Sequence, residues 1–225
     1  MNMLRVKRRY TILTNEEYFK DISNYITSIE HCIEDTKNIS VDVIGDTLFT
    51  FDLCFIGFLN RNIYLAEGFI QMIHNRNLTC AGALLRLQLD NCMRLLALNI
   101  AEDEQQVVDC ILNGDNISKL KDKNGKRMTD AHLKEQLETY DSQLSNVYNE
   151  TSGFIHFSSK AFYQSVEEIT DDGIRFTIGG DLPEKRNEPL IECTQAFIHY
   201  YKLFLHFMKS EAEWKKKYDE SAEDN

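Results

Sequence analysis

The chain has 225 residues, of which 43% are hydrophobic, and its formal net charge at pH 7 is −11. This apolar content can build a folded core, so the composition excludes a chain that is disordered throughout. The acidic balance argues against a protein that coats nucleic acid non-specifically, because contacts with phosphates supply most of the affinity in that class.

Several motif-defined protein classes are also excluded. The sequence has no glycine-rich phosphate loop, no paired-cysteine zinc spacing, no nucleophile elbow and no His-Glu-x-x-His sequence. P-loop enzymes, zinc fingers, α/β-hydrolases and zincin proteases therefore do not fit.

We expect a single cytoplasmic domain over residues 1–218 and a disordered acidic tail over residues 219–225. No apolar run approaches the roughly 20 residues that span a bilayer, and the basic N-terminus lacks the apolar stretch of a secretory signal, so we expect no membrane association. The cysteines lie far apart, mostly in apolar runs, and we interpret them as reduced core residues. They are Cys32, Cys54, Cys80, Cys92, Cys110 and Cys193.

The first half of the chain predicts four helices. The first begins behind Thr14 or Asn15 as the N-cap and carries apolar residues at three- and four-residue spacing. The second, over about 47–75, is apolar on most faces, which suits a central helix, and the third, over about 78–99, is rich in leucine. A short acidic helix should follow over 102–112 and end at Asn113-Gly114.

The second half predicts a mobile loop from Asn116 to Arg127 and then a helix capped by Thr129. A break is expected at Ser152-Gly153. The buried stripe of this helix should consist of Leu133, Leu137, Tyr140, Leu144 and Val147.

Two short strands at about Val166 to Ile178 should form a hairpin around Asp172-Gly173, ended by Gly179-Gly180. The last helix should run from Pro189 to Tyr218. We therefore expect a mainly α fold: an antiparallel helical bundle with one small β-hairpin before its last helix.

Two basic clusters stand out from the acidic background. The first contains Arg5, Lys7, Arg8 and Arg9, and the second contains Lys119, Lys121, Lys123, Lys126 and Arg127, interrupted by Asp122. Such clusters can hold a nucleic acid at a defined place, or they can be a solvated terminus and a solvated loop.

Arg86, Asp90 and Arg94 are spaced by four on an otherwise apolar helix, so they share one face. This stripe is either an intrahelical ion ladder or the polar wall of a site.

His156 lies among Ser152, Ser158 and Ser159, and it is either a general acid–base or a partly buried, hydrogen-bonded histidine. Glu192, His199 and His206 share a face of the last helix. Their spacing of seven is too long for one ion without further ligands, and we expect no metal.

The order of these helices, with LLRLQLDNCMRLLAL and YNETSGFIHFS, resembles uncharacterised bacterial helical families related to the HEPN superfamily. In those families an Arg and an acidic residue four positions later precede a Ser-x-x-x-His stretch, which here corresponds to Arg86, Asp90, Ser152 and His156. The resemblance implies an antiparallel bundle that often dimerises, and a role in phage defence or toxin–antitoxin biology.

Arg127 and His132 have the spacing of the HEPN ribonuclease motif and form a weaker alternative site. However, Arg127 precedes the Thr129 cap, so we expect it in the loop and not on the helix with His132.

The first functional hypothesis is a HEPN-like protein that acts on RNA or a nucleotide without a cofactor. His156 would be the general acid–base, Arg86 and Arg94 would hold phosphate charge, and Asp90 would orient an Arg or the His. The residues that would bind substrate are Ser152, Ser158, Lys121, Lys123, Lys126 and Arg127.

The second hypothesis is a non-catalytic module whose bundle surface binds a protein partner or itself. It predicts that Arg86 and Asp90 form a buried or interfacial ion pair with no adjoining cavity. Convergence of Arg86, Asp90 and His156 on a pocket would favour the enzyme, and their dispersal would favour the module. With either function we expect a homodimer through the second or the last helix, because both are apolar on almost every side.

Overall fold

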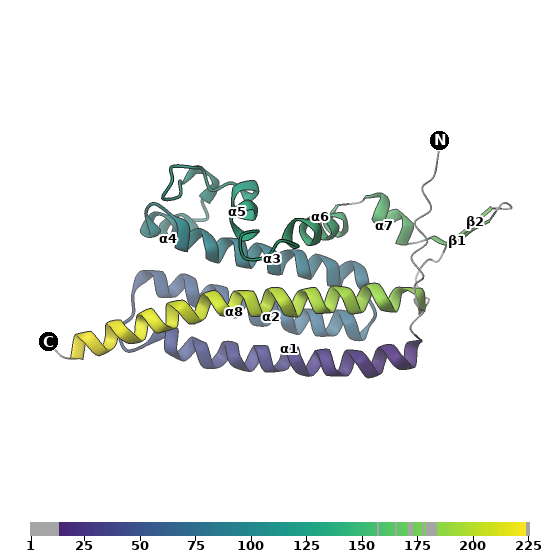
Figure 1. The fold of residues 1–225 in the computed structure, drawn as a ribbon, viewed down its shortest axis with the longest axis horizontal. Coiled ribbons are helices and arrows are strands. Elements are labelled where there is room, and N and C mark those ends of the chain that lie inside the picture. The colour runs from purple at the N-terminus through teal and green to yellow at the C-terminus, as the bar shows by residue number, and fades with distance from the viewer. Residues whose placement is uncertain are drawn as a thin grey trace.

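The computed structural model describes residues 14–156, 158–164, 166–170, 173–176, 178 and 184–223. The chain is mainly helical, with one two-stranded hairpin before its last helix in the described part (Figure 1), which confirms the predicted fold class. The first basic cluster and Gly179-Gly180 lie outside the described residues.

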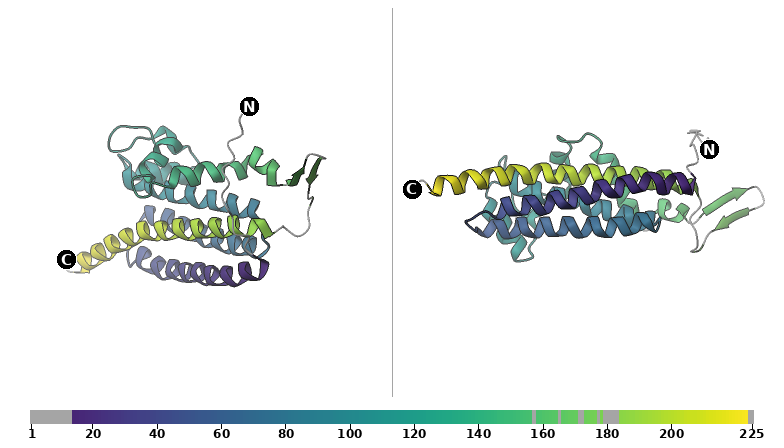
Figure 2. Two further views of the ribbon diagram at one scale, coloured as in Figure 1. Left: turned by 45° about the vertical axis from the view of Figure 1, so that its right-hand side comes forward. Right: turned by 90° about the horizontal axis from the view of Figure 1, so that it is seen from below.

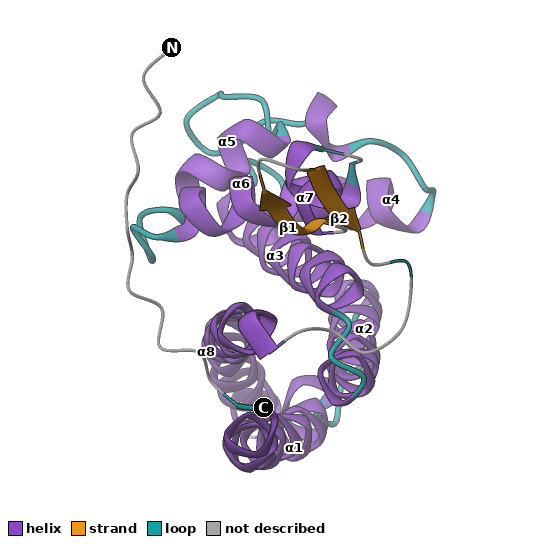
Figure 3. Cartoon of the chain, turned by 90° about the vertical axis from the view of Figure 1, so that its right-hand side faces the viewer, coloured by secondary structure: helices purple, strands orange, loops and turns teal. Residues whose placement is uncertain are grey.

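Four long helices form a bundle whose members surround a common core when the molecule is seen end-on (Figure 3). They are α1 (Asn15–Ile44), α2 (Thr50–His74), α3 (Leu78–Ile100) and α8 (Asn187–Glu223). Helix α2 runs antiparallel to α1 and α3, as expected. Helix α8 runs parallel to α1 (Figure 2): the Asn187 side chain donates to that of Asn15, so both helices start at the same end.

A second layer of shorter helices packs on α3, outside the bundle (Figures 1 and 3). It contains α4 (Glu104–Leu112), the 3-10 turn η1 (Ile117–Lys119), α5 (Asp130–Leu137) and α6 (Leu144–Ile155). These elements, with α7 (Ser159–Gln164), return the chain to the end where α8 begins.

The predicted hairpin is present as β1 (Val166–Thr170) and β2 (Gly173–Phe176), and Ile169 lies opposite Ile174 in its antiparallel register. It projects beyond the end of the bundle (Figure 1), and the short turn η2 (Glu184–Arg186) precedes α8.

The predicted helix caps are confirmed. The Thr14 and Glu17 side chains form a reciprocal capping box at the start of α1, and the Thr129 hydroxyl accepts from the backbone N–H of His132 at the start of α5. Helix α4 ends at Asn113, followed by Gly114 in the left-handed region at φ 72°.

Three predicted helix boundaries were wrong. The helix behind Thr129 is two helices, α5 and α6, and Tyr140 between them is 55% exposed although Leu133, Leu137 and Leu144 are buried as expected. The chain turns there because Asp141 accepts hydrogen bonds from the Gln143 backbone and the Tyr200 hydroxyl.

The expected break at Ser152-Gly153 is absent, since the Ser152 hydroxyl bonds to the Tyr148 carbonyl oxygen inside a continuous α6. The tail predicted to be disordered is helical as far as Glu223.

The core lies between the four long helices and is rich in aromatic side chains. The Phe69 and Phe197 rings stack with their centroids 4.0 Å apart. All six cysteines lie among the described residues and none forms a disulfide bond; five are buried, but Cys80 is exposed and is not a core residue. Within the described residues no helix has both the length and the apolar character of a transmembrane span.

Candidate functional site

The stripe of Arg86, Asp90 and Arg94 is divided between different partners. Arg94 pairs with Asp90 at 3.2 Å and with Asp130 at 2.7 Å, and Asp90 also pairs with Arg61 of α2 at 3.2 Å. Arg86 instead lies over the Tyr148 ring of α6, 3.9 Å from its centroid, and donates to the Tyr148 hydroxyl. Arg86 and Asp90 therefore do not form the predicted ion pair.

Asp90 marks the outer end of a polar seam between α2 and α3. Arg61 donates to the Asn91 side chain as well as to Asp90, and Asn91 donates to Asn62 at 3.4 Å. Asn62, Asn91 and the neighbouring Gln88 are fully buried. We interpret the bond between Asn62 and Asn91 as a contact that fixes the register of the two helices, because a slip would separate these two buried amides. The buried Gln88 amide has no hydrogen-bond partner among the described residues, so it does not contribute to this register. Sequence analysis missed the seam, although three amides in apolar helices were the available signal.

His156 is exposed at the C-terminal end of α6, and its backbone N–H donates to the Ser152 carbonyl oxygen. The Ser158 hydroxyl donates to the Gly153 carbonyl oxygen, which closes the end of the helix. The structure shows no interaction between His156 and Arg86 or Asp90. The predicted catalytic groups are thus dispersed along the α3–α6 face.

The predicted mobile loop is a hydrogen-bonded turn built around Asp122. Its carboxylate bonds to His132 Nε2 at 2.8 Å and accepts from the backbone N–H groups of Asn124 and Lys126. Burial alone raises the pKa of Asp122, but these hydrogen bonds outweigh burial and hold it below its ordinary value. The backbones of Lys121 and Arg127 form an isolated antiparallel β-bridge that closes the turn.

The cations of this turn all face solvent. They are Lys119, Lys121, Lys123, Lys126 and Arg127. Because Asp122 is only 2% exposed, the surface of the turn is more positive than the sequence count indicated. The weaker Arg127 and His132 pair is not assembled, since His132 is buried against Asp122 while Arg127 is exposed.

The histidines of α8 do not form a metal centre with Glu192. His199 faces Asp141 at 3.3 Å, whereas Glu192 lines a cavity about two turns away on α8. Among the described residues there is no group of three or more His, Cys, Asp or Glu side chains placed to hold a metal ion.

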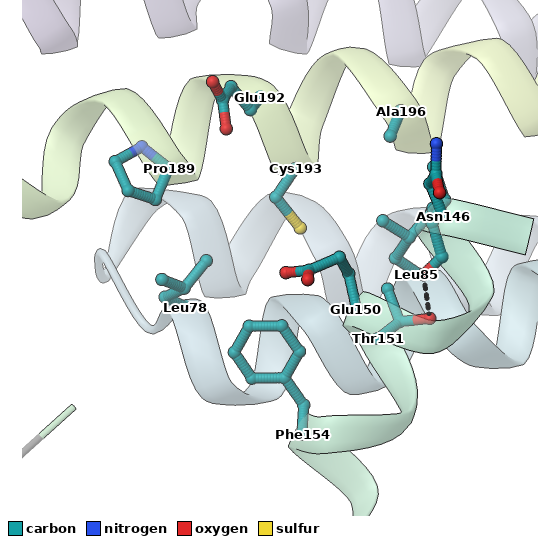
Figure 4. A pocket seen from close by; sticks show the side chains of 11 residues that line it. Leu78, Leu85, Asn146, Glu150, Thr151, Phe154, Pro189, Glu192, Cys193 and Ala196 are labelled. Atoms are coloured by element: carbon teal, nitrogen blue, oxygen red, sulfur yellow. Dashed lines mark hydrogen bonds between the residues drawn. The ribbon is translucent and has the colours of Figure 1, made fainter. Parts of the chain in front are cut away.

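A cavity of about 230 Å³ lies between α3, α6 and the start of α8, and is here called the α6–α8 groove (Figure 4). It is lined by Leu78, Leu85, Asn146, Val147, Glu150, Thr151, Phe154, Pro189, Glu192, Cys193 and Ala196. None of the predicted catalytic or substrate-binding residues belongs to this lining.

The groove exists because α6 packs closely on α3 beside α8. Gly82 allows this contact: a Cβ atom there would collide with the Phe154 ring. The Thr151 hydroxyl donates to the Val147 carbonyl oxygen within α6, so the hydroxyl is already hydrogen-bonded and the Thr151 methyl group contributes apolar surface to the groove wall. The floor is therefore apolar.

Two carboxylates border this apolar floor. Cys193 extends from α8 toward Glu150 and Phe154 of α6, and the Glu192 carboxylate lies beside the α8 ribbon (Figure 4). Sequence analysis had considered Glu192 only as a metal ligand and had not considered Glu150. The placement of both glutamates at one groove depends on α6 and α8 meeting in space, which no local pattern reports.

Comparison with known proteins gives no further assignment: no family model matches the chain, and no curated protein or solved structure matches it.

Proposed function

We propose that this protein is a non-catalytic interaction module that binds a segment of a protein partner in the α6–α8 groove. The segment would insert an apolar side chain onto the floor and place a Lys or Arg beside the exposed Glu192. The observation that carries this proposal is an apolar cavity bordered by two carboxylates.

The occupant follows from the chemistry of the lining. A cavity of about 230 Å³ is below the roughly 300–1,000 Å³ of typical small-molecule pockets, so it suits one or two side chains of a larger ligand. An amphipathic helix presents apolar anchors and charged groups at three- and four-residue spacing, which matches an apolar floor with a charged edge. The carboxylates would supply orientation and specificity for a basic residue.

The dispersal of the predicted catalytic groups also supports a module over an enzyme. General acid–base catalysis needs the titrating group within hydrogen-bond reach of the reacting atom and beside the groups that stabilise charge. Arg86, Asp90 and His156 instead have separate surroundings.

A displayed library of random 16-residue peptides tests the proposal. Selected peptides should combine a large apolar residue with a Lys or Arg three or four positions away. Glu192→Lys should weaken their binding at least tenfold, and changing the peptide's basic residue to Glu should restore it. Glu213→Lys, an exposed change far along α8, is the matched control. Equal affinity for the wild type and Glu192→Lys would overturn the proposal.

RNA binding is a second candidate, favoured by the five exposed cations around the buried Asp122. Replacing Lys121, Lys123 and Lys126 with Gln should then weaken binding of a labelled RNA and reduce its dependence on salt concentration, because each phosphate contact releases counterions. Lys37→Gln, on the exposed face of α1, is the control.

An RNA-cleavage assay distinguishes the interaction-module proposal from the alternative of a HEPN-like ribonuclease of bacterial defence. We expect the purified wild type and His156→Ala to give the same RNA degradation and the same effect on cell growth. Cleavage that His156→Ala abolishes would replace the module proposal with the enzyme.

A further inference from the structure

A second cavity, of about 180 Å³, lies at the opposite end of the bundle from the α6–α8 groove. It is formed where the start of α2, the end of α3, the start of α4 and the distal part of α8 meet. We call it the aromatic pocket, and its lining consists of Phe51, Phe55, Leu98, Asn99, Glu104, Glu211 and Trp214.

Three of the residues that line the pocket are aromatic. The Phe51 ring is 6.0 Å from that of Phe55 and 5.7 Å from that of Trp214, in edge-to-face arrangements. Trp214 is 47% exposed, so the pocket is open to solvent at this ring. Aromatic faces carry negative potential and attract ammonium and guanidinium groups, most strongly at tryptophan.

Two more lining residues, Glu104 and Glu211, carry carboxylates that lie near each other. Glu104 lies in the exposed first turn of α4, and Glu211 is half-buried on α8. Burial and the nearby Glu104 carboxylate raise the pKa of Glu211. Within the described residues neither glutamate has an ion-pair partner, whereas the neighbouring Lys123 ammonium bonds to the Asn99 carbonyl oxygen.

We propose that the aromatic pocket binds an organic cation, an alkylammonium or guanidinium group whose carbon chain contacts the rings and whose charge lies between Glu104 and Glu211. Such a group complements both the carboxylates and the rings: its charge compensates the two like charges, and its apolar carbons cover aromatic surface. The volume of about 180 Å³ suits a single Lys or Arg side chain or a small free amine.

An inorganic ion fits the lining less well. Calcium takes six to eight oxygen ligands and magnesium requires octahedral oxygen coordination, whereas the side chains of this pocket offer oxygen ligands only from Glu104, Glu211 and Asn99. Two carboxylates and one amide cannot fill such a coordination shell.

Trp214 is the only tryptophan of the chain, so its fluorescence reports directly on the pocket. The full-length protein would be titrated with N-acetyl-lysine methylamide, with the corresponding arginine derivative and with putrescine. N-acetyl-norleucine methylamide, which keeps most of the carbon chain without the charge, is the matched control ligand. We expect a saturable change with the cations, with a Kd in the millimolar range, and none with norleucine or calcium chloride.

Two variants test whether the fluorescence change comes from binding in the aromatic pocket. Glu211→Gln should weaken binding of the cations at least fivefold, and Glu213→Gln, exposed on the same helix, should leave it unchanged. Tighter binding of the lysine derivative would point to a partner's side chain, and tighter binding of putrescine to a free polyamine. Both results support the proposal.

Three results would overturn it: no saturable change with any cation, an equal response to norleucine, or an equal affinity of Glu211→Gln. The proposal does not depend on the α6–α8 groove. Glu192 lies at the other end of α8, so Glu192→Lys should not alter the change in Trp214 fluorescence on cation binding. A failure of the peptide selection and a failure of this titration are therefore distinguishable.

Discussion

Lys215 and Asp52 form an ion pair of 2.5 Å between the distal part of α8 and the first turn of α2, and both side chains are almost completely buried. The Lys215 ammonium also donates to the Thr47 carbonyl oxygen and lies 4.4 Å from the centroid of the Phe49 ring. Asp52 in turn accepts from the Phe49 backbone N–H. The pair thus ties the end of α8 to the connection between α1 and α2.

Lys215→Met should therefore lower the free energy of unfolding by about 3–5 kcal/mol, because it leaves the Asp52 carboxylate buried without its counter-charge. Adding Asp52→Asn should recover part of the loss. The exposed change Lys216→Met should stay within about 0.5 kcal/mol of wild type. Urea denaturation followed by circular dichroism measures all four proteins, and equal stability of the Lys215→Met and Lys216→Met variants would contradict the prediction.

Two glycines in helices should respond to alanine in opposite directions. Gly82→Ala places a methyl group into the Phe154 ring, and such overpacking costs about 1–3 kcal/mol, more than the gain of roughly 1 kcal/mol in helix propensity. Gly57→Ala meets open space and should gain up to about 1 kcal/mol. Denaturation curves at one pH compare the two variants, and stabilisation by Gly82→Ala would show that α6 does not pack closely on α3.

The Asp122 turn predicts a pH dependence of stability. The pKa of this carboxyl in the folded protein lies below its ordinary value of 3.8, so the ionised group stabilises the fold above about pH 4. This stabilisation is lost as the pH falls through the lowered pKa. Asp122→Asn should therefore be less stable than wild type at pH 7, and the difference should narrow at pH 3. Asp115→Asn, an exposed change in the same segment, should show no such convergence.

The parts of the fold that could be predicted from sequence depend on residues close together in the chain. The Thr14 and Thr129 caps and the end at Asn113-Gly114 are set by side chains within a few positions, and apolar spacing identified the buried faces. The extent of α8 could not be predicted in this way. It depends on distant contacts, such as the bond from the Asp46 backbone N–H to the Asp219 carboxylate.

The site was predicted less well for a related reason. A spacing of four shows that Arg86, Asp90 and Arg94 share a face, but it does not show which element approaches that face. Tyr148 from α6 takes Arg86 out of the stripe, and Arg61 from α2 shares Asp90 with Arg94. Both cavities form only where three or more helices meet, so the sequence carried no direct signal for them.

The expected homodimer was assigned from sequence to the second or the last helix, and of these two α2 remains the candidate surface. The apolar side chains of α8 that favoured an interface are covered within the chain, since Phe197 and Phe204 are fully buried. On α2, Leu53, Gly57 and Tyr64 form one exposed stripe, with Leu53 at 47% and Tyr64 at 63% exposure.

We expect light scattering at micromolar concentration and moderate salt to give twice the chain mass of 26.2 kDa for the wild type. The double change Leu53→Glu and Tyr64→Glu should reduce it to one chain, because a two-fold contact would bring four like charges together. Leu112→Glu, which is exposed at the end of α4, is the control and should leave the mass unchanged. A wild-type mass near 26.2 kDa would show the dimer prediction to be wrong, and a double variant that remains dimeric would place the interface elsewhere than on α2.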